Sequence, residues 1–190
     1  MKIVLLSGST RRDSLNTTVL ETVRHILAGL PGAHETVDLA VAELPYYEAG
    51  LELADGSAAV RAAKELVAGA GLLFISTPSY NGQMPGALKN ALDWLSRAEG
   101  ETPSPLTGRV TAVASASPGG RGGVEAQAGL VAVLERCGAR VVEHEPVGVA
   151  RAAKASVEGG RFTDPELVAR LESLTRAALA AAGARAEVLV

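Results

Sequence analysis

The chain has few residues of the kinds that form disulfides or metal sites. Its 190 residues include one cysteine and three histidines. Cys137 has no second cysteine with which to pair, and its place in a helical apolar pattern favours a small buried residue over a reactive thiol. His25, His34 and His144 lie far apart and lack the spacing of metal ligands. We therefore predict no metal site.

Aromatic and basic residues are also scarce. Phe, Trp and Tyr together make up 3% of the chain, and the formal net charge is −3. Proteins that bind nucleic acid present a basic surface, and those that bind single strands add aromatic side chains on which bases stack. The composition offers neither feature, so we predict no nucleic-acid partner.

Long hydrophobic runs are absent. The apolar runs have the length of strands, whereas a helix that spans a membrane needs about 20 apolar residues. Met1-Lys2 leads directly into a strand pattern without the apolar region of a secretory signal. We expect a cytoplasmic protein with no membrane partner. A length of 190 residues suits a single domain over residues 1–190.

Several well-understood catalytic motifs are missing. The sequence has no Gly-Lys-Ser or Gly-Lys-Thr, which disfavours an ATP-binding P-loop. It has no Cys-x-x-Cys, His-Glu-x-x-His or Gly-x-Ser-x-Gly, so neither a zinc site nor a hydrolase triad is indicated. The glycine-rich run at residues 115–123 does not fit Gly-x-Gly-x-x-Gly, which makes a dinucleotide-binding Rossmann domain a poor interpretation.

Strand and helix patterns alternate along the chain. Patterns typical of strands occur at residues 2–7, 34–40, 72–75, 109–115 and 140–145. Helical spacing begins near Ser14 or Asn16, at Ser57, at Ala87, at Val124 and after Asp164-Pro165. Residues 42–56 are expected to form a long ordered loop, and the last helix to span about 165–182 with a frayed tail beyond Gly183. This alternation predicts an α/β fold, a doubly wound five-stranded parallel sheet.

The segment of residues 71–97 lies at the centre of this predicted fold. Leu72 to Ile75 is a continuous apolar run, which suits a strand covered on both faces. The following loop contains Pro78, Pro85 and two glycines, which prevent regular structure before helical spacing resumes. Open parallel sheets bind ligands at loops of this kind, which follow a central strand.

Two further runs have ligand-binding chemistry, although each has a plain structural alternative. Residues 8–16 combine hydroxyl groups, an amide, the Arg11 guanidinium and a helix start, which suits a phosphate monoester. The same side chains could merely cap the helix. Residues 115–123 are rich in glycine and could offer backbone N–H groups to a ligand, or could form a flexible surface turn.

Three spaced motifs together resemble the NAD(P)H-dependent FMN reductase family of flavodoxin-like proteins. They are Gly8 to Asn16, the run from Pro78 through Tyr80-Asn81 and Pro85-Gly86 to Trp94, and Ala116 to Gly120. The resemblance extends from about Met1 to Val147. It implies the flavodoxin-like strand order 2-1-3-4-5, with FMN at the boundary of strands one and three. The chain departs from the family at Ser79, where glutamate is common.

The resemblance also implies which residues bind the cofactor. They are Ser9, Arg11, Ser14, Leu15 and Asn16 in the first motif, Pro78, Ser79, Tyr80, Asn81 and Gly82 in the second, and Ser115, Ser117, Gly119 and Gly120 in the third. In the family pattern the first motif binds the FMN phosphate, the second contacts the isoalloxazine ring, and the third reaches the ring's carbonyl-rich edge. No catalytic side chain is expected, because the cofactor carries the chemistry.

The implied function is an NAD(P)H-dependent oxidoreductase that uses bound FMN to reduce flavin, a quinone or a similar small acceptor. The family also implies a homodimer or homotetramer, with Leu92, Trp94 and Leu95 either at a subunit interface or in the core of a monomer. The alternative function is an FMN-binding electron carrier that docks to protein partners, although a net charge of −3 does not suggest the acidic face of such carriers. The sequence does not decide between NADH and NADPH.

Overall fold

The computed structural model of the chain describes residues 1–48, 50 and 57–188. The loop expected at residues 42–56 therefore lies partly outside the described residues. Its described part contains a short 3-10 helix, η1 (Val41–Glu43).

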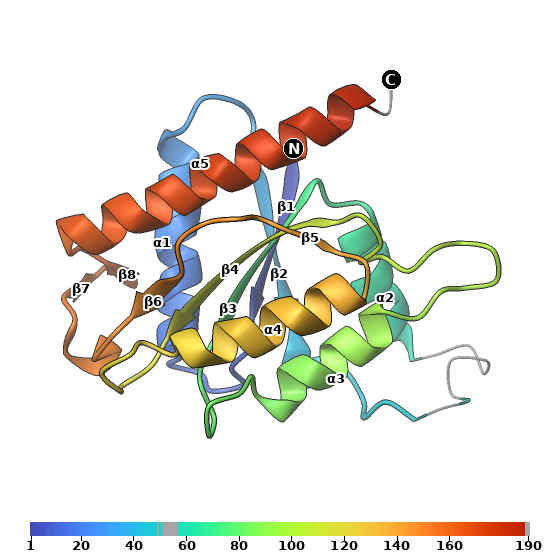
Figure 1. Cartoon of the computed structure of the whole chain (residues 1–190), viewed down its shortest axis with the longest axis horizontal. Coiled ribbons are helices and arrows are strands. Elements are labelled where there is room, and N and C mark those ends of the chain that lie inside the picture. The colour runs from blue at the N-terminus through green and yellow to red at the C-terminus, as the bar shows by residue number, and fades with distance from the viewer. Residues whose placement is uncertain (49, 51–56, 189–190) are drawn as a thin grey trace.

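A parallel sheet forms the centre of the molecule (Figure 1). Its strands are β1 (Lys2–Ser7), β2 (Glu35–Ala40), β3 (Leu72–Thr77), β4 (Val110–Ala116) and β5 (Arg140–Val141). They lie in the order β2-β1-β3-β4-β5, and each neighbouring pair is parallel. The predicted flavodoxin-like order is confirmed.

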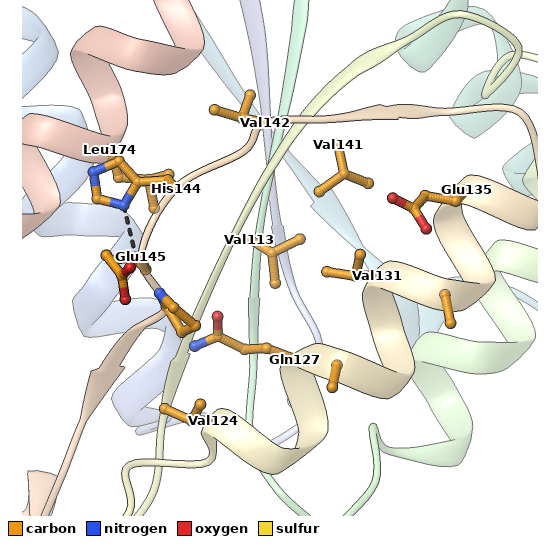
Figure 2. Close-up of a pocket in the computed structure, with 13 residues that line it drawn as sticks. Val113, Val124, Gln127, Val131, Glu135, Val141, Val142, His144, Glu145 and Leu174 are labelled. Atoms are coloured by element: carbon orange, nitrogen blue, oxygen red, sulfur yellow. Dashed lines mark hydrogen bonds between the residues drawn. The ribbon is translucent and has the colours of Figure 1, made fainter.

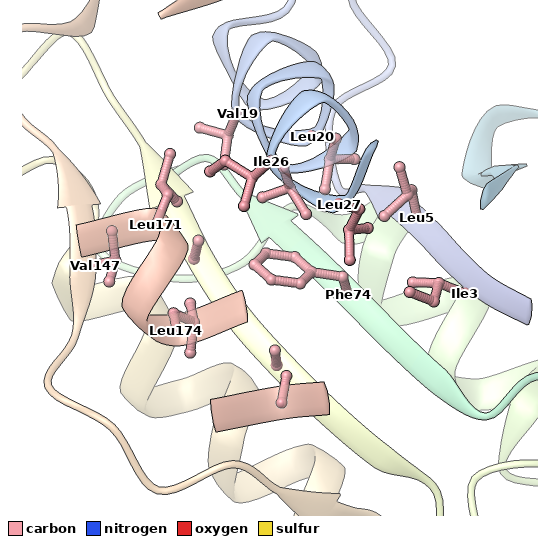
Figure 3. Close-up of a cluster of buried hydrophobic side chains, with 14 of the residues drawn as sticks. Ile3, Leu5, Val19, Leu20, Ile26, Leu27, Phe74, Val147, Leu171 and Leu174 are labelled. Carbon is pink, nitrogen blue, oxygen red and sulfur yellow. The ribbon is translucent and has the colours of Figure 1, made fainter. Parts of the chain in front are cut away.

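Helices cover both faces of this sheet (Figure 1). They are α1 (Leu15–Gly29), α2 (Ala58–Ala68), α3 (Gly86–Leu95), α4 (Val124–Arg136) and α5 (Pro165–Val188). Helices α1 and α5 pack on one face, where Ile3, Leu5 and Phe74 are buried (Figure 3). Helices α2, α3 and α4 pack on the other face over Val4 and Leu6. Successive strand residues point to opposite faces, so the continuous apolar runs supply both cores.

Local sequence signals position the starts of three helices. The Ser14 Oγ accepts a hydrogen bond from Asn16 N at 3.2 Å, and the Ser57 Oγ accepts one from Val60 N at 3.3 Å. Asp164 Oδ1 accepts one from Leu167 N at 2.9 Å. These side chains satisfy N–H groups that have no partner within their own helix. The predicted starts near Ser14, at Ser57 and after Asp164 are confirmed.

The fifth strand is shorter than predicted. β5 ends at Val141, residues 142–146 leave the sheet, and β6 (Val147–Val149) then pairs with the last residues of β4. Pro146 has no N–H group to donate to a neighbouring strand, which explains why the pairing does not continue through it. Between β6 and α5 lie the 3-10 helix η3 (Ala152–Lys154) and a hairpin of β7 (Val157–Glu158) and β8 (Arg161–Phe162).

Helix α5 also differs from its prediction, because it continues past Gly183 to Val188. The helix is therefore longer than the expected span of about 165–182. Alanine has the highest helix propensity, and the alanine-rich composition around Gly183 offsets the cost of that glycine.

Helix α3 settles the two interpretations of its apolar residues. Leu92, Trp94 and Leu95 are buried against the sheet and α2 in the protein's own core. Their assignment to a subunit interface is therefore wrong, and the core interpretation is confirmed. Among the described residues, no helix combines the length and apolar character needed to cross a membrane.

Candidate functional site

Three turns leave the same edge of the sheet. β3 lies between β1 and β4 and is parallel to both, so the segments that follow these strands start side by side. We name them the first turn (residues 8–14), the second turn (residues 78–85) and the third turn (residues 117–123). Gly8 N donates to Ser76 O at 2.8 Å, which joins the start of the first turn to β3.

Asn16 of α1 connects the ends of β3 and β4. Its Nδ2 donates to Ala116 O at 3.1 Å, and its Oδ1 accepts from the Ser76 hydroxyl at 2.9 Å and from Ala116 N at 2.9 Å. The residue is only 2% exposed. Both polar atoms of its side chain are thus engaged within the protein, so the amide joins the start of α1 to the ends of β3 and β4.

The first turn carries donors that suit an anion. Ser9 N donates to Ser7 Oγ, and Arg11 N donates to Ser9 Oγ, both at 3.3 Å, which gives the turn a defined shape. The Arg11 side chain is exposed, Ser14 is the buried cap of α1, and Leu15 packs against the core. The first four residues of α1 include no acidic side chain, and the positive end of its helix dipole favours an anion at this end.

The second turn is a two-residue hairpin. Tyr80 N donates to Gln83 O at 2.8 Å, and Gln83 N donates to Tyr80 O at 3.1 Å. Between them, Asn81 and Gly82 have φ angles of 54° and 82°, which is the geometry of a type I′ turn. Pro78 is buried at its base, whereas Tyr80 is 48% exposed. A rigid turn thus presents an aromatic ring at the edge.

The third turn depends on a close approach of two backbone segments. A Cβ atom on Gly122 would lie 2.7 Å from the carbonyl carbon of Gly148, and the φ angle of Gly122 is 64°. Only glycine fits there. The buried Ser115 hydroxyl donates to Gly122 O at 2.7 Å, so Ser115 shapes the turn from inside. Ser117 is half-buried, and its Oγ accepts from Gly119 N at 3.3 Å. Gly119 and Gly120 are exposed.

The structure adds one residue that the sequence analysis missed. The Ser79 hydroxyl donates to Glu125 Oε1 at 2.9 Å, which joins the second turn to the N-terminal end of α4. The backbone N–H at Glu125 and the Ser79 hydroxyl, with help from nearby Arg121, lower the pKa of the Glu125 carboxyl below its ordinary value. A carboxylate therefore lies beside Ser79, at the position where glutamate is common in the family, but it belongs to Glu125 of α4. An acidic residue in the first turn of a helix is the sequence signal that could have drawn attention to it.

The arrangement fits a phosphorylated ligand with a flat ring. Hydroxyl groups, an arginine and a helix start gather at the first turn, and an exposed aromatic ring and glycine backbone lie at the other two. The described residues contain no group of His, Cys, Asp or Glu side chains able to hold a metal ion. These donors suit FMN, whose phosphate and ring need these two kinds of contact.

Comparison with known sequences supports this interpretation. The family model for NADPH-dependent FMN reductases matches residues 1–154. A quinone reductase from Escherichia coli is 36% identical over 136 residues, which are 70% of this chain and 69% of that protein. A 2-hydroxy-1,4-benzoquinone reductase from Burkholderia is 39% identical over 131 residues, or 68% of each chain. An NAD(P)H-dependent FMN reductase from Pseudomonas aeruginosa is 30% identical over 165 residues, which cover 86% of this chain and 85% of the relative.

Comparison with solved structures gives the same result. The flavoenzyme FerB from Paracoccus denitrificans, an NAD(P)H:(acceptor) oxidoreductase, has a TM-score of 0.85 at 27% identity and covers 96% of this chain and 97% of its own. An NADH:FMN oxidoreductase solved in its apo form has a TM-score of 0.70 at 23% identity, with 94% and 89% of the two chains covered. The match of the family model over most of the chain, together with these relatives, shows that the chain belongs to the NADPH-dependent FMN reductase family.

Proposed function

We propose that the protein is an NAD(P)H-dependent oxidoreductase that binds FMN on the three turns and reduces a quinone or a similar small acceptor. The observation that carries this proposal is the convergence of the turns at one sheet edge, joined by Asn16. When bound, FMN supplies reversible acceptance of a hydride and release of electrons. The protein's own residues bind and orient the reactants.

We assign the residues by their positions. At the first turn, Ser9 and Arg11 bind the phosphate, while Ser14, Leu15 and Asn16 hold the turn and the start of α1 in place. In the second turn the ring is contacted by Pro78, Ser79, Tyr80, Asn81 and Gly82. At the third turn, Ser117, Gly119 and Gly120 lie beside the ring's polar edge, and we assign the Gly120 N–H as its donor, because Ser117 N already donates to Val149 O and Gly119 N to Ser117 Oγ. Ser115 supports this turn through Gly122.

The names of the relatives guide the choice of acceptor. Quinone reductases, a benzoquinone reductase and an azoreductase are among them, so we expect a planar, conjugated acceptor. Two relatives, an NADPH azoreductase and an NAD(P)H-dependent FMN reductase, are named as reductases of small molecules, which does not support the alternative of an electron carrier acting on protein partners.

We further propose a single domain over residues 1–190, located in the cytoplasm and assembled as a homodimer or homotetramer. The packing of α5 on the same core as α1 supports one domain. Tyr46 is 89% exposed beside a pocket of about 540 Å³ that Thr10 of the first turn also lines. An exposed aromatic side chain beside a hollow suits a surface that associates with another subunit.

The proposal is tested with purified protein reconstituted with FMN. We expect a yellow protein that bleaches anaerobically with NADPH or NADH and then reduces benzoquinone. The Arg11→Ala variant should bind FMN about tenfold more weakly, because one charge-assisted contact to the phosphate is lost. Lys154→Ala, at a basic residue outside the turns, serves as the control. A reconstituted protein that retains no flavin would overturn the proposal.

A further inference from the structure

A separate pocket lies between α4, α5 and the segment that links β5 to β6 (Figure 2). Its volume is about 380 Å³, within the range of small-molecule sites in proteins. The pocket exists because residues 142–146 leave the sheet between the two short strands that pair with β4. Val113 in the middle of β4 pairs with Ile75 of β3 on one side, but neither β5 nor β6 pairs with it on the other side, and it lines the pocket.

The walls of this pocket are mainly aliphatic. Its apolar lining consists of Val113, Val124, Val131, Val141, Val142, Leu174, Ala128, Ala132 and Pro146. In Figure 2 the labelled valines surround the open space from β4, α4 and the linking segment. Walls of this kind favour an apolar ligand body, because burying apolar surface removes it from water.

One polar atom of a largely buried side chain faces this apolar space. Gln127 is only 5% exposed, and its Nε2 donates to Ser115 Oγ at 2.7 Å and to Val147 O at 2.9 Å. A backbone carbonyl can only accept, so these contacts fix which end of the amide carries the nitrogen. The Gln127 Oε1 then points into the pocket (Figure 2) and has no hydrogen-bond partner among the described residues. This acceptor is open to the pocket, where a ligand that brings an N–H or O–H group can donate to it.

The charged side chains that line the pocket are acidic. Glu135 and Glu145 line it, and no lysine or arginine does so among the described residues. The His144 ring hydrogen-bonds to Ser173 Oγ at 3.0 Å through Nε2 and to Glu145 O at 2.7 Å through Nδ1, so both its nitrogens are occupied. Arg170 Nη2 donates to Pro146 O at 2.9 Å but does not line the pocket. The local field therefore favours a cation over an anion.

We propose that this pocket binds a small apolar amine. The amine donates an N–H to Gln127 Oε1, its hydrocarbon body contacts the valines, and the carboxylates of Glu135 and Glu145 favour its positive charge. The site is independent of the cofactor, since none of its lining residues belongs to the three turns. It shares only the Gln127–Ser115 hydrogen bond with the support of the third turn.

The experiment uses the full chain, with and without FMN, and phenethylamine as the probe. We expect saturable binding by calorimetry, together with a shift of the Gln127 side-chain amide signal in NMR spectra. Phenylacetate has a similar body but a carboxylate in place of the amine, and we expect it to bind at least tenfold more weakly. Equal binding of the two compounds, or no saturable binding of the amine, would overturn the proposal.

Two sets of variants locate the binding. Ala128 is exposed and lines the pocket, so Ala128→Phe should fill part of the pocket and abolish binding. Ala180 is an exposed residue of α5 that does not line the pocket, so Ala180→Phe should leave binding unchanged. The double change Glu135→Gln with Glu145→Gln should weaken amine binding about tenfold and phenylacetate binding not at all. If Ala128→Phe instead dissociates an oligomer in sedimentation experiments, the pocket is an interface between copies of the chain and the proposal is wrong.

Discussion

Asn16 shows how much a single side chain can hold together. Replacing it with alanine removes three hydrogen bonds and leaves the Ser76 hydroxyl and the Ala116 backbone without those partners. We expect Asn16→Ala to lower the free energy of unfolding by about 2–4 kcal/mol, measured by urea denaturation. Thr17→Ala, at the exposed neighbouring position, should change it by less than about 0.5 kcal/mol. Equal effects of the two variants would show that Asn16 does not join the turns.

The lowered pKa of Glu125 predicts how the stability of the fold depends on pH. Its pKa is lowered in the folded protein, so the carboxylate stabilises the fold above the ordinary value of 4.5, and this stabilisation is lost as the pH falls through the lowered value. The difference in unfolding free energy between the wild type and Glu125→Gln should therefore be constant near neutral pH and shrink in acid. Glutamine retains an acceptor for the Ser79 hydroxyl, which separates the charge from the hydrogen bond. A difference that grows on acidification would contradict the assigned direction.

At this scale, the sequence predicts contacts between neighbours and misses contacts between distant residues. The capping roles of Ser14, Ser57 and Asp164 follow from short-range rules and are confirmed. The hydrogen bonds of Ser79 with Glu125 and of Asn16 with Ala116 join residues 46 and 100 positions apart. Such pairs become visible only when the strand order brings the turns together.

The second turn is the element whose backbone is most constrained. Gly82 has a φ angle of 82°, and a side chain there would strain the turn, although its Cβ would meet no neighbouring atom. We expect Gly82→Ala to cost about 1 kcal/mol of stability and to weaken FMN binding, measured by denaturation and by flavin fluorescence.

Gly86→Ala provides a matched control for this prediction. Gly86 begins α3, has no positive φ angle, and an added Cβ would also meet no neighbouring atom. Alanine should therefore be neutral or slightly stabilising there. If both variants lose FMN affinity equally, the loss comes from the added methyl group and not from the turn geometry.

Elements with continuous apolar patterns are predicted well, and irregular ones are not. β1, β3 and β4 match their apolar runs closely because they are buried on both faces. The fifth strand alternates only weakly, so the sequence analysis extended it through residues that in the structure line a pocket. The hairpin of β7 and β8 was not predicted, although the Gly159-Gly160 pair between its strands is a known hairpin signal.

At the scale of the molecule, the hydrophobic core between the sheet and α1 depends on α5. This helix lies beyond the residues matched by the family model, yet Leu171, Leu174 and Ala178 are buried with α1 over the sheet. We expect a chain ending at residue 163 to lose cooperative unfolding, measured by circular dichroism and thermal denaturation. A chain ending at residue 184 keeps these buried residues and should unfold almost as the full chain does. A cooperative transition in the shorter chain would show that the family-matched region folds alone.

Alternation and crossover handedness predict a doubly wound parallel sheet, and the resemblance to the FMN reductase family supplied the strand order and the edge that carries the turns. The lining of the two pockets could not, because it depends on how segments distant in sequence pack. The sequence also could not tell the two interpretations of α3 apart, and its apolar face serves the protein's own core.

The division of the last strand into β5 and β6 affects how molecules behave when they collide in concentrated solution. A long, flat outer strand offers a ladder of free N–H and C=O groups onto which a neighbouring molecule can add its own strand. Here β5 has two residues and β6 has three, with a proline just before β6. Neither piece is long enough to template intermolecular β-pairing, so this side of the sheet is protected against aggregation.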